Sequence, residues 1–174
     1  IRLNDILDEK EITLTQTQFF LVSYNQKLIT IDIHRVYLEY QRTKVYWLNW
    51  TNRSKKFEKY TEEVIRSLLV LKIMYYQPTG AVLAALTTSI PETIGEVRNW
   101  DYRYCWLRDA TFVLYSLLIA GYREEAAAWR EWLLRVVAGR PQDLHILYGL
   151  AGERRLSEIE LPWLPGYQGA APVR

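Results

Sequence analysis

The stretch at residues 98–112, RNWDYRYCWLRDATF, changes its periodicity within a few residues and so constrains the fold strongly. Its aromatic residues occupy every second position and are Trp100, Tyr102, Tyr104 and Trp106. Alternation at period two predicts an extended segment whose aromatic side chains share one face, opposite Asp101, Arg103 and Cys105. After Asp109, the apolar positions of ATFVLYSLLIAG fit a helix instead. The chain must therefore lead an aromatic extended segment directly into a helix.

Helical patterns dominate the rest of the chain. We expect helices within residues 32–52, 61–77, 109–120 and 122–139. Thr61 is the predicted N-cap of the second, Pro78 and Gly80 end it, and its nearly all-round apolar surface predicts that both faces are covered. The apolar run at residues 11–24 predicts a strand or a pair of strands. Residues 81–106 form a long non-helical connection, and such loops are usually functional.

The composition narrows the class of protein. The chain has 174 residues, enough for one domain with a core, and a formal net charge of +2 from 22 basic and 20 acidic residues. This balance gives no electrostatic reason to expect a nucleic-acid or membrane partner. The chain has no apolar run of membrane-spanning length and no signal-peptide pattern, so we expect a cytoplasmic protein. An isoleucine at position 1 and a loop-like end predict a piece of a longer protein.

Several residues carry groups that could act as metal ligands, nucleophiles or catalytic acids. His34 and His145 stand without a second ligand at suitable spacing, so we expect no metal and no cofactor. Cys105 is expected to be a buried, inert thiol. Five loop glutamates could form a pair of catalytic acids in principle, but no local pattern distinguishes any of them: Glu92, Glu96, Glu153, Glu158 and Glu160.

The Arg108–Asp109 pair and the aromatic segment each allow more than one interpretation. Asp109 precedes an apolar helical run, so it is either a plain N-cap or one half of a polar pair in which Asp accepts from hydroxyl groups and Arg donates to them. The aromatic face is either core, a base-stacking platform or the wall of a sugar site. Base stacking is disfavoured because acidic residues balance the arginines nearby.

Residues 87–112, TTSIPETIGEVRNWDYRYCWLRDATF, resemble a segment of glycoside hydrolase family 15, the prokaryotic glucoamylase- and trehalase-like enzymes. The resemblance continues through GYREEAAAWREWLLRVVAG, LHILYGLAGERRLSEIEL and GYQGAAPVR, and extends back to RSLLVLKIMYYQPTGAVLAA. It covers residues 60–174 well. Leu86 and Ala171 depart from the family pattern, in which proline and arginine are common at these positions.

The resemblance implies a mainly α protein with an (α/α)6 barrel. Residues 1–30 would be the end of an N-terminal β-sandwich, residues 31–59 a linker helix, and residues 60–174 the first helical hairpins of a truncated barrel. In the family, the residues matching Asp109 and Arg108 hold the innermost glucose, and those matching Tyr102 and Trp106 wall the pocket.

The family hydrolyses α-glucosides at the non-reducing end with inversion, by means of an acid and a base glutamate. Both lie beyond the end of this sequence in the family, so no catalytic residue is assigned here. We expect a fragment of a hydrolase of carbohydrate metabolism that acts on maltooligosaccharides or trehalose and is inactive alone. The alternatives are a non-catalytic helical scaffold and a sugar-binding relic. The sequence does not specify the oligomeric state.

Overall fold

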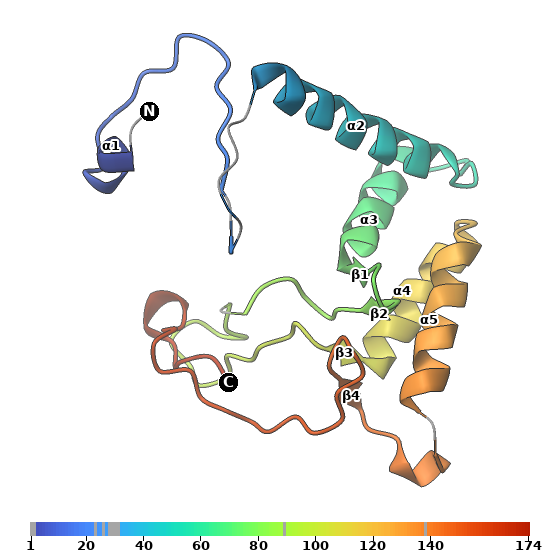
Figure 1. Cartoon of the computed structure of the whole chain (residues 1–174). Helices are drawn as coiled ribbons and strands as arrows, with labels where there is room; N and C mark the ends of the chain where they lie inside the picture. Colours follow the sequence, from blue (N-terminus) through green and yellow to red (C-terminus); the bar gives the residue numbers. More distant parts are fainter. Residues whose placement is uncertain (1–2, 23, 26, 28–31, 89, 138) are drawn as a thin grey trace. The chain divides into compact units, whose positions relative to one another are not determined.

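Helices supply most of the regular structure of the chain (Figure 1). The computed structural model describes residues 3–22, 24–25, 27, 32–88, 90–137 and 139–174. The helices are α1 (Leu3–Leu7), α2 (Ile33–Asn52), α3 (Thr61–Met74), α4 (Leu107–Ile119) and α5 (Arg123–Val136), with short 3-10 turns at Pro141–Asp143 and Tyr167–Gly169. The strands are β1 (Tyr75–Tyr76), β2 (Ala81–Val82), β3 (Cys105–Trp106) and β4 (Leu147–Tyr148). The chain forms two units, residues 1–49 and 50–174.

The first unit contains α1 and most of α2. Lys10 closes α1 through ion pairs to Asp5 at 3.1 Å and Asp8 at 3.2 Å. The strand predicted at residues 11–24 is wrong for the described residues of that range, which exclude residue 23 and carry no strand. Their side chains are exposed, so no buried face selects a strand register. The helix predicted at residues 32–52 is confirmed as α2.

In the second unit, α3 begins and ends differently from the prediction. Thr61 is the first helical residue rather than the N-cap, because Tyr60 takes a left-handed conformation with φ of 55° and the Thr61 hydroxyl donates to the Phe57 carbonyl. The helix ends at Met74, and the chain turns back in the antiparallel β1–β2 hairpin, which pairs Tyr75 with Val82. The expectation that both faces of α3 are covered is wrong, since Val70 and Ile73 are nearly half exposed.

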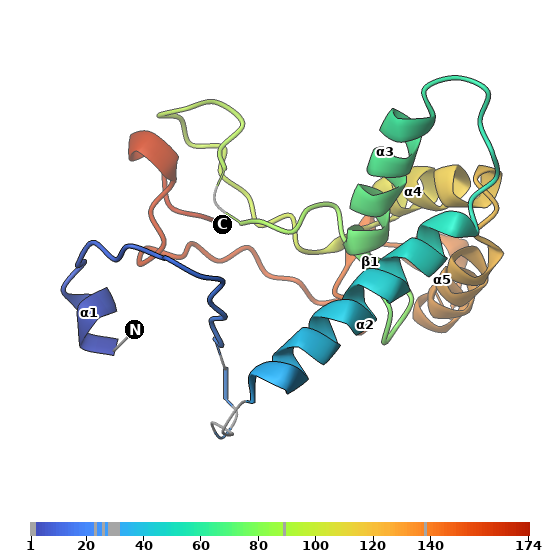
Figure 2. The same ribbon diagram turned by 90° about the horizontal axis from the view of Figure 1, so that it is seen from above.

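Helices α4 and α5 pack side by side, joined by a tight turn at Gly121 (Figures 1 and 2). Both predicted helices are confirmed with shifted ends, although residue 138 lies outside the described residues. The hairpin strand β2 packs against both helices. Together these elements bury one apolar cluster, which consists of Ala81, Val82, Cys105, Ala110, Leu114, Trp132, Val136 and Tyr148. Because Cys105 belongs to this cluster, the core anchors the C-terminal end of the aromatic segment.

The predicted long connection runs from β2 to β3, and its described residues contain no helix. Its last residues form β3, which pairs antiparallel with β4 through Cys105 opposite Tyr148 and Trp106 opposite Leu147. The helix α4 follows without a break at Leu107. The sequence prediction that an extended segment leads directly into a helix is therefore confirmed.

Candidate functional site

The aromatic segment is held in an extended course by backbone hydrogen bonds from other parts of the second unit. The amides of Ala84 and Ala85 donate to the carbonyls of Tyr104 and Tyr102, at 3.0 and 3.1 Å. Further along, the Asp101 amide donates to the Arg174 carbonyl at 2.7 Å, and the Arg174 amide donates to the Asn99 carbonyl at 3.0 Å. The course of the segment is thus set by tertiary pairing as well as by its alternating sequence.

All four aromatic side chains of the segment line one groove of about 590 Å³. Cys105, on the other face, is fully buried in the core, as the alternation predicts. Asp101 departs from the prediction because it also lines the groove. It accepts hydrogen bonds from the backbone and the guanidinium of Arg103, which tie the segment into a local turn. The aromatic residues of the sequence pattern therefore form the wall of a cavity.

The four residues singled out from the sequence lie next to one another, two of them in the groove lining and two beside it. The rings of Tyr102 and Trp106 are 6.4 Å apart between centroids and belong to the groove lining. The Arg108 guanidinium lies 5.8 Å from the centre of the Trp106 ring and 3.1 Å from the Asp109 carboxylate. Arg108 and Asp109 are not lining residues of the cavity itself and stand at its margin, in the first turn of α4.

The plain N-cap interpretation of Asp109 is wrong. Helix α4 begins at Leu107, with Trp106 in the N-cap position, so Asp109 is already within the first turn. An acidic side chain is favourable there because of the helix dipole. Its carboxylate makes no cap hydrogen bond and remains about 31% exposed, which leaves it accessible to a ligand.

The acids that line the groove are each paired with an arginine. Glu92 pairs with Arg98 at 3.4 Å, Asp101 with Arg103 at 2.9 Å, and Glu158 with Arg174 at 3.4 Å. The charges of the groove therefore cancel locally. A cavity of this kind, aromatic on one wall and neutral with many donors and acceptors, suits an uncharged polar ligand better than an ionic one.

Residues 58–174 match the family model described as "Glycosyl hydrolases family 15". The chain belongs to this family. A trehalase of Thermoplasma acidophilum is 39% identical over 141 residues, which are 81% of this chain and 24% of that protein. A trehalase of Mycobacterium tuberculosis is 48% identical over 112 residues, 63% of this chain and 16% of that protein. Trehalase 1 of Sulfolobus acidocaldarius is 44% identical over 116 residues, covering 65% and 21%.

The chain thus spans a quarter or less of the length of these family 15 relatives. No solved structure matches it significantly. The matched region includes the whole groove, the β1–β2 hairpin and helices α3 to α5, while α2 lies before it.

Two side chains that line the groove, Tyr102 and Asp101, have shifted pKa values. Burial, followed by the hydrogen bond that the Tyr102 hydroxyl donates to Glu92 at 3.0 Å, raises the pKa of Tyr102. Burial also acts to raise the pKa of Asp101, but the hydrogen bonds from Arg103 outweigh it and lower that pKa. Tyr102 is therefore held as a neutral donor and Asp101 as a carboxylate across the neutral pH range.

Sequence reasoning missed the part of the groove that comes from the end of the chain. Its residues there are Leu147, Leu156, Ser157, Glu158, Ile159, Leu161 and Arg174. Two of the five loop glutamates, Glu92 and Glu158, line the groove. No local signal distinguishes these two, because the tertiary pairing of distant segments brings them there.

The Cys105 thiol does not line the groove. Burial raises the pKa of the Cys105 thiol, which keeps it protonated and inert. Within the described residues, no group of three or more His, Cys, Asp or Glu side chains is placed to hold a metal ion. In that part of the chain, no helix is long and apolar enough to cross a membrane.

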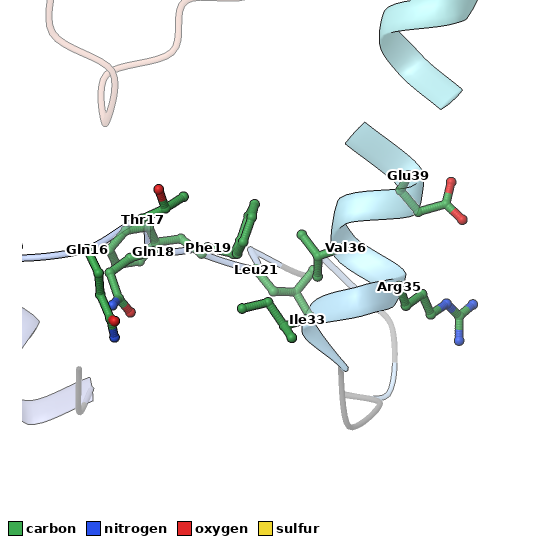
Figure 3. A pocket seen from close by; sticks show the side chains of 10 residues that line it. Gln16, Thr17, Gln18, Phe19, Leu21, Ile33, Arg35, Val36 and Glu39 are labelled. Carbon is green, nitrogen blue, oxygen red and sulfur yellow. The ribbon is translucent and has the colours of Figure 1, made fainter. Parts of the chain in front are cut away.

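A second cavity, of about 620 Å³, lies in the first unit. Figure 3 shows Phe19, Leu21, Ile33 and Val36 gathered around it, while Arg35 and Glu39 point away. This lining also includes polar side chains, namely Gln16, Thr17, Gln18, Arg35 and Glu39. It contains none of the residues singled out from the sequence and lies outside the region that the family model matches. The aromatic groove of the second unit is therefore the better candidate for the functional site.

Proposed function

We propose that this chain is the sugar-anchoring part of an inverting α-glucoside hydrolase that removes glucose from the non-reducing end of its substrate. Trehalose is the first substrate to test, because the similar proteins are named trehalases, and maltooligosaccharides are the alternative. One observation carries the proposal. An aromatic groove with locally cancelled charges has the Arg108–Asp109 pair beside its Trp106 wall, within the region that matches the family.

In this proposal, Asp109 accepts hydrogen bonds from hydroxyl groups of the innermost glucose, and Arg108 donates to the same ring. Tyr102 and Trp106 pack against the apolar C–H face of the sugar. The exposure of Asp109 beside the half-buried Trp106 favours a binding site over a plain scaffold, which would bury the aromatic rings and use Asp109 only as a cap.

We further propose that the general acid and the general base are glutamates outside this sequence. Helices α3 to α5 would then be the first helices of an (α/α)6 barrel in the proposed domain of residues 60–174. Residues 1–30 would belong to a β-sandwich and residues 31–59 to a linker. On this basis, the 174-residue chain binds glucosides but does not hydrolyse them, because proton transfer to the leaving oxygen and activation of water both require the missing groups.

The test compares Asp109→Asn with Asp143→Asn in the 174-residue chain. Asp143 is a matched control, because it also pairs with a nearby arginine, Arg140 at 3.3 Å, but lies outside the groove. We expect millimolar binding of glucose and trehalose by calorimetry or NMR titration, weakened about 10-fold or more by Asp109→Asn and unchanged by Asp143→Asn.

The same samples are assayed for release of glucose from trehalose and maltotriose. We expect none from any variant. Glucose release that disappears in Asp109→Asn would contradict the proposal that the catalytic glutamates lie outside this sequence. Equal loss of binding in both variants would show that Asp109 has no specific role in binding the sugar.

A further inference from the structure

A further cavity of the second unit, of about 410 Å³, lies at the C-terminal end of α5 and shares no lining residue with the groove. Its lining includes Thr79 from the β1–β2 turn, Arg135 and Val136 from α5, and Gly152 and Arg154 from the segment after β4. Among the described residues that line it, the two arginines are the only charged ones. This wall therefore carries two positive charges and, in its described part, no carboxylate.

Each of the two guanidinium groups is oriented by one main-chain carbonyl. Nη2 of Arg135 donates to the Thr79 carbonyl at 3.1 Å, and Nη2 of Arg154 donates to the Asp143 carbonyl at 2.6 Å. A guanidinium has five N–H donors, so each arginine keeps donors for a ligand. The Thr79 hydroxyl is a further donor, because its oxygen accepts from the Ala81 amide at 3.3 Å and its hydrogen can be donated to the cavity.

No carboxylate of the described residues forms an ion pair with either guanidinium. The nearby Asp143 pairs instead with Arg140 at 3.3 Å, and Glu131 pairs with Arg130 at 2.7 Å. The wall thus differs from the groove, in which each acid is paired with an arginine. The positive charge of the cavity is not cancelled locally.

A purely structural role explains one of these arginines but not both together. Arg135 lies in the last turn of α5, where a cation interacts favourably with the helix dipole. Arg154 adds a second positive charge to the same cavity, and like charges repel each other. An anion bound between the two guanidinium groups would remove this repulsion.

The segment that carries Arg154 is fixed against α5. The Trp132 indole donates to the Leu150 carbonyl at 3.1 Å. Gly152 has φ of 98°, and a Cβ added to it would lie 2.7 Å from Cγ2 of Val136. The backbone approaches α5 so closely because residue 152 has no side chain. The cavity wall is therefore preorganised, which lowers the entropic cost of binding a ligand.

We propose that Arg135, Arg154 and Thr79 bind a phosphate group, as the free inorganic ion or as part of a small phosphorylated metabolite. The planar fork of a guanidinium matches two phosphate oxygens and forms charge-assisted hydrogen bonds to them. A phosphate dianion would also neutralise the two charges of the wall. The volume lies within the range of small-ligand pockets, so the site can hold a phosphate with the group that carries it. This inference concerns a site separate from the groove and does not depend on the proposed function.

The experiment titrates the 174-residue chain with inorganic phosphate, glycerol 3-phosphate and acetate by calorimetry, in phosphate-free buffer at constant ionic strength. We expect phosphate to bind with a Kd of about 1 mM or below, and about 10-fold more tightly than acetate. Arg135→Gln and Arg154→Gln should each weaken phosphate binding about 10-fold, because each removes charge-assisted hydrogen bonds. Arg154→Lys should recover only part of the affinity, since an ammonium keeps the charge without the planar fork.

Arg155→Gln is the matched control, because Arg155 is exposed, follows Arg154 directly and does not line the cavity. It removes the same charge from the chain and should leave the phosphate affinity unchanged. Circular dichroism checks that each variant folds. If Arg154→Gln does not fold, Arg135→Gln decides alone, since Arg135 is exposed on α5.

Glycerol 3-phosphate has no sugar ring that the groove could bind, so it reports on this cavity. Its tighter binding than that of phosphate would support the site and identify a phosphorylated metabolite as the ligand, whereas equal or weaker binding would identify the free ion. The site is overturned if phosphate binds no more tightly than acetate, or if Arg155→Gln weakens phosphate binding as much as Arg135→Gln does.

Discussion

Glu125 lies in the first turn of α5, and its carboxylate is buried, since the side chain is only 4% exposed. The Trp50 indole and the Lys72 ammonium both donate to Oε1 of Glu125 at 2.9 Å. The Trp50 ring also stacks on Tyr122 at a centroid distance of 4.1 Å. Burial acts to raise the pKa of Glu125, but the hydrogen bonds from Trp50 and Lys72 outweigh it, so the pKa is lowered. This one side chain links α2, α3 and α5.

The lowered pKa of Glu125 predicts a specific loss of stability in acid. Since the folded state binds the proton less readily than the unfolded state, the contribution is complete above the ordinary glutamate pKa of 4.5 and is lost as the pH falls through the lower folded value. We expect Glu125→Gln to reduce the free energy of unfolding by about 3 kcal/mol at pH 7, and by less as the pH falls below 4.5.

Urea unfolding curves measured from pH 7 to pH 3 check this difference. Glu124→Gln is the control, because Glu124 pairs with Arg53 but is 82% exposed, and a surface pair is worth about 1 kcal/mol or less. A difference between wild type and Glu125→Gln that stays constant with pH would contradict the assignment.

At the scale of elements, the sequence predicts where helices exist better than where they begin. The apolar periodicity identifies α2, α3, α4 and α5. The first residues of α3 and α4 differ from the predicted ones because local hydrogen bonds and the conformation of the preceding residue determine where each helix begins. Thr61 donates to Phe57 instead of capping α3, and α4 starts at Leu107, directly after the extended residue Trp106 that ends β3. The strand expected after residue 10 fails for a different reason, since nothing in the described part of that unit pairs with it.

The β1–β2 turn carries a constraint that only the structure reveals. Gly80 has φ of 90°, and a Cβ added to it would lie 2.6 Å from the Ala128 carbonyl oxygen in α5. Gly80→Ala therefore combines backbone strain with a clash against helix backbone, and we expect it to lower the free energy of unfolding by about 3 kcal/mol.

Gly95→Ala separates these two effects. Gly95 has a similar φ of 81°, but a Cβ there would meet nothing within 4 Å. It should cost about 1 kcal/mol from strain alone. Equal destabilisation of the two variants in urea unfolding would show that contact between the turn and α5 is unimportant.

At the scale of the whole molecule, the groove is assembled from segments that are far apart in the sequence. The wall of residues 100–106 was predictable because alternation is a local property. The opposite side, from residues 147–174, was not, because it depends on the β3–β4 pairing and on the bonds of Arg174. The resemblance to the family pointed to Tyr102, Trp106, Arg108 and Asp109, whereas the contribution of residues 147–174 to the groove emerged only once distant segments were placed together.

The same assembly leaves an apolar face of α4 in contact with water. Its exposed residues include Phe112 and Tyr115, which are 68% and 62% exposed, and Ile119, which is 49% exposed. These positions lie three and four residues apart and so form a stripe on one side of the helix. Continuous apolar surface of this kind drives association in water. We therefore expect the 174-residue chain to self-associate at micromolar concentrations.

Replacing Phe112 and Tyr115 together by glutamate should restore a monomer, because two charges cannot be buried in an apolar contact without partners. Arg130→Glu is the control, since it changes the net charge by the same amount at a 71% exposed position on α5. Sedimentation velocity over a range of concentrations distinguishes the outcomes. A monomer at all concentrations in the unmodified chain, or dissociation by Arg130→Glu to the same extent, would mean that this face does not drive association. Self-association removed only by the α4 double substitution would identify the stripe as the contact.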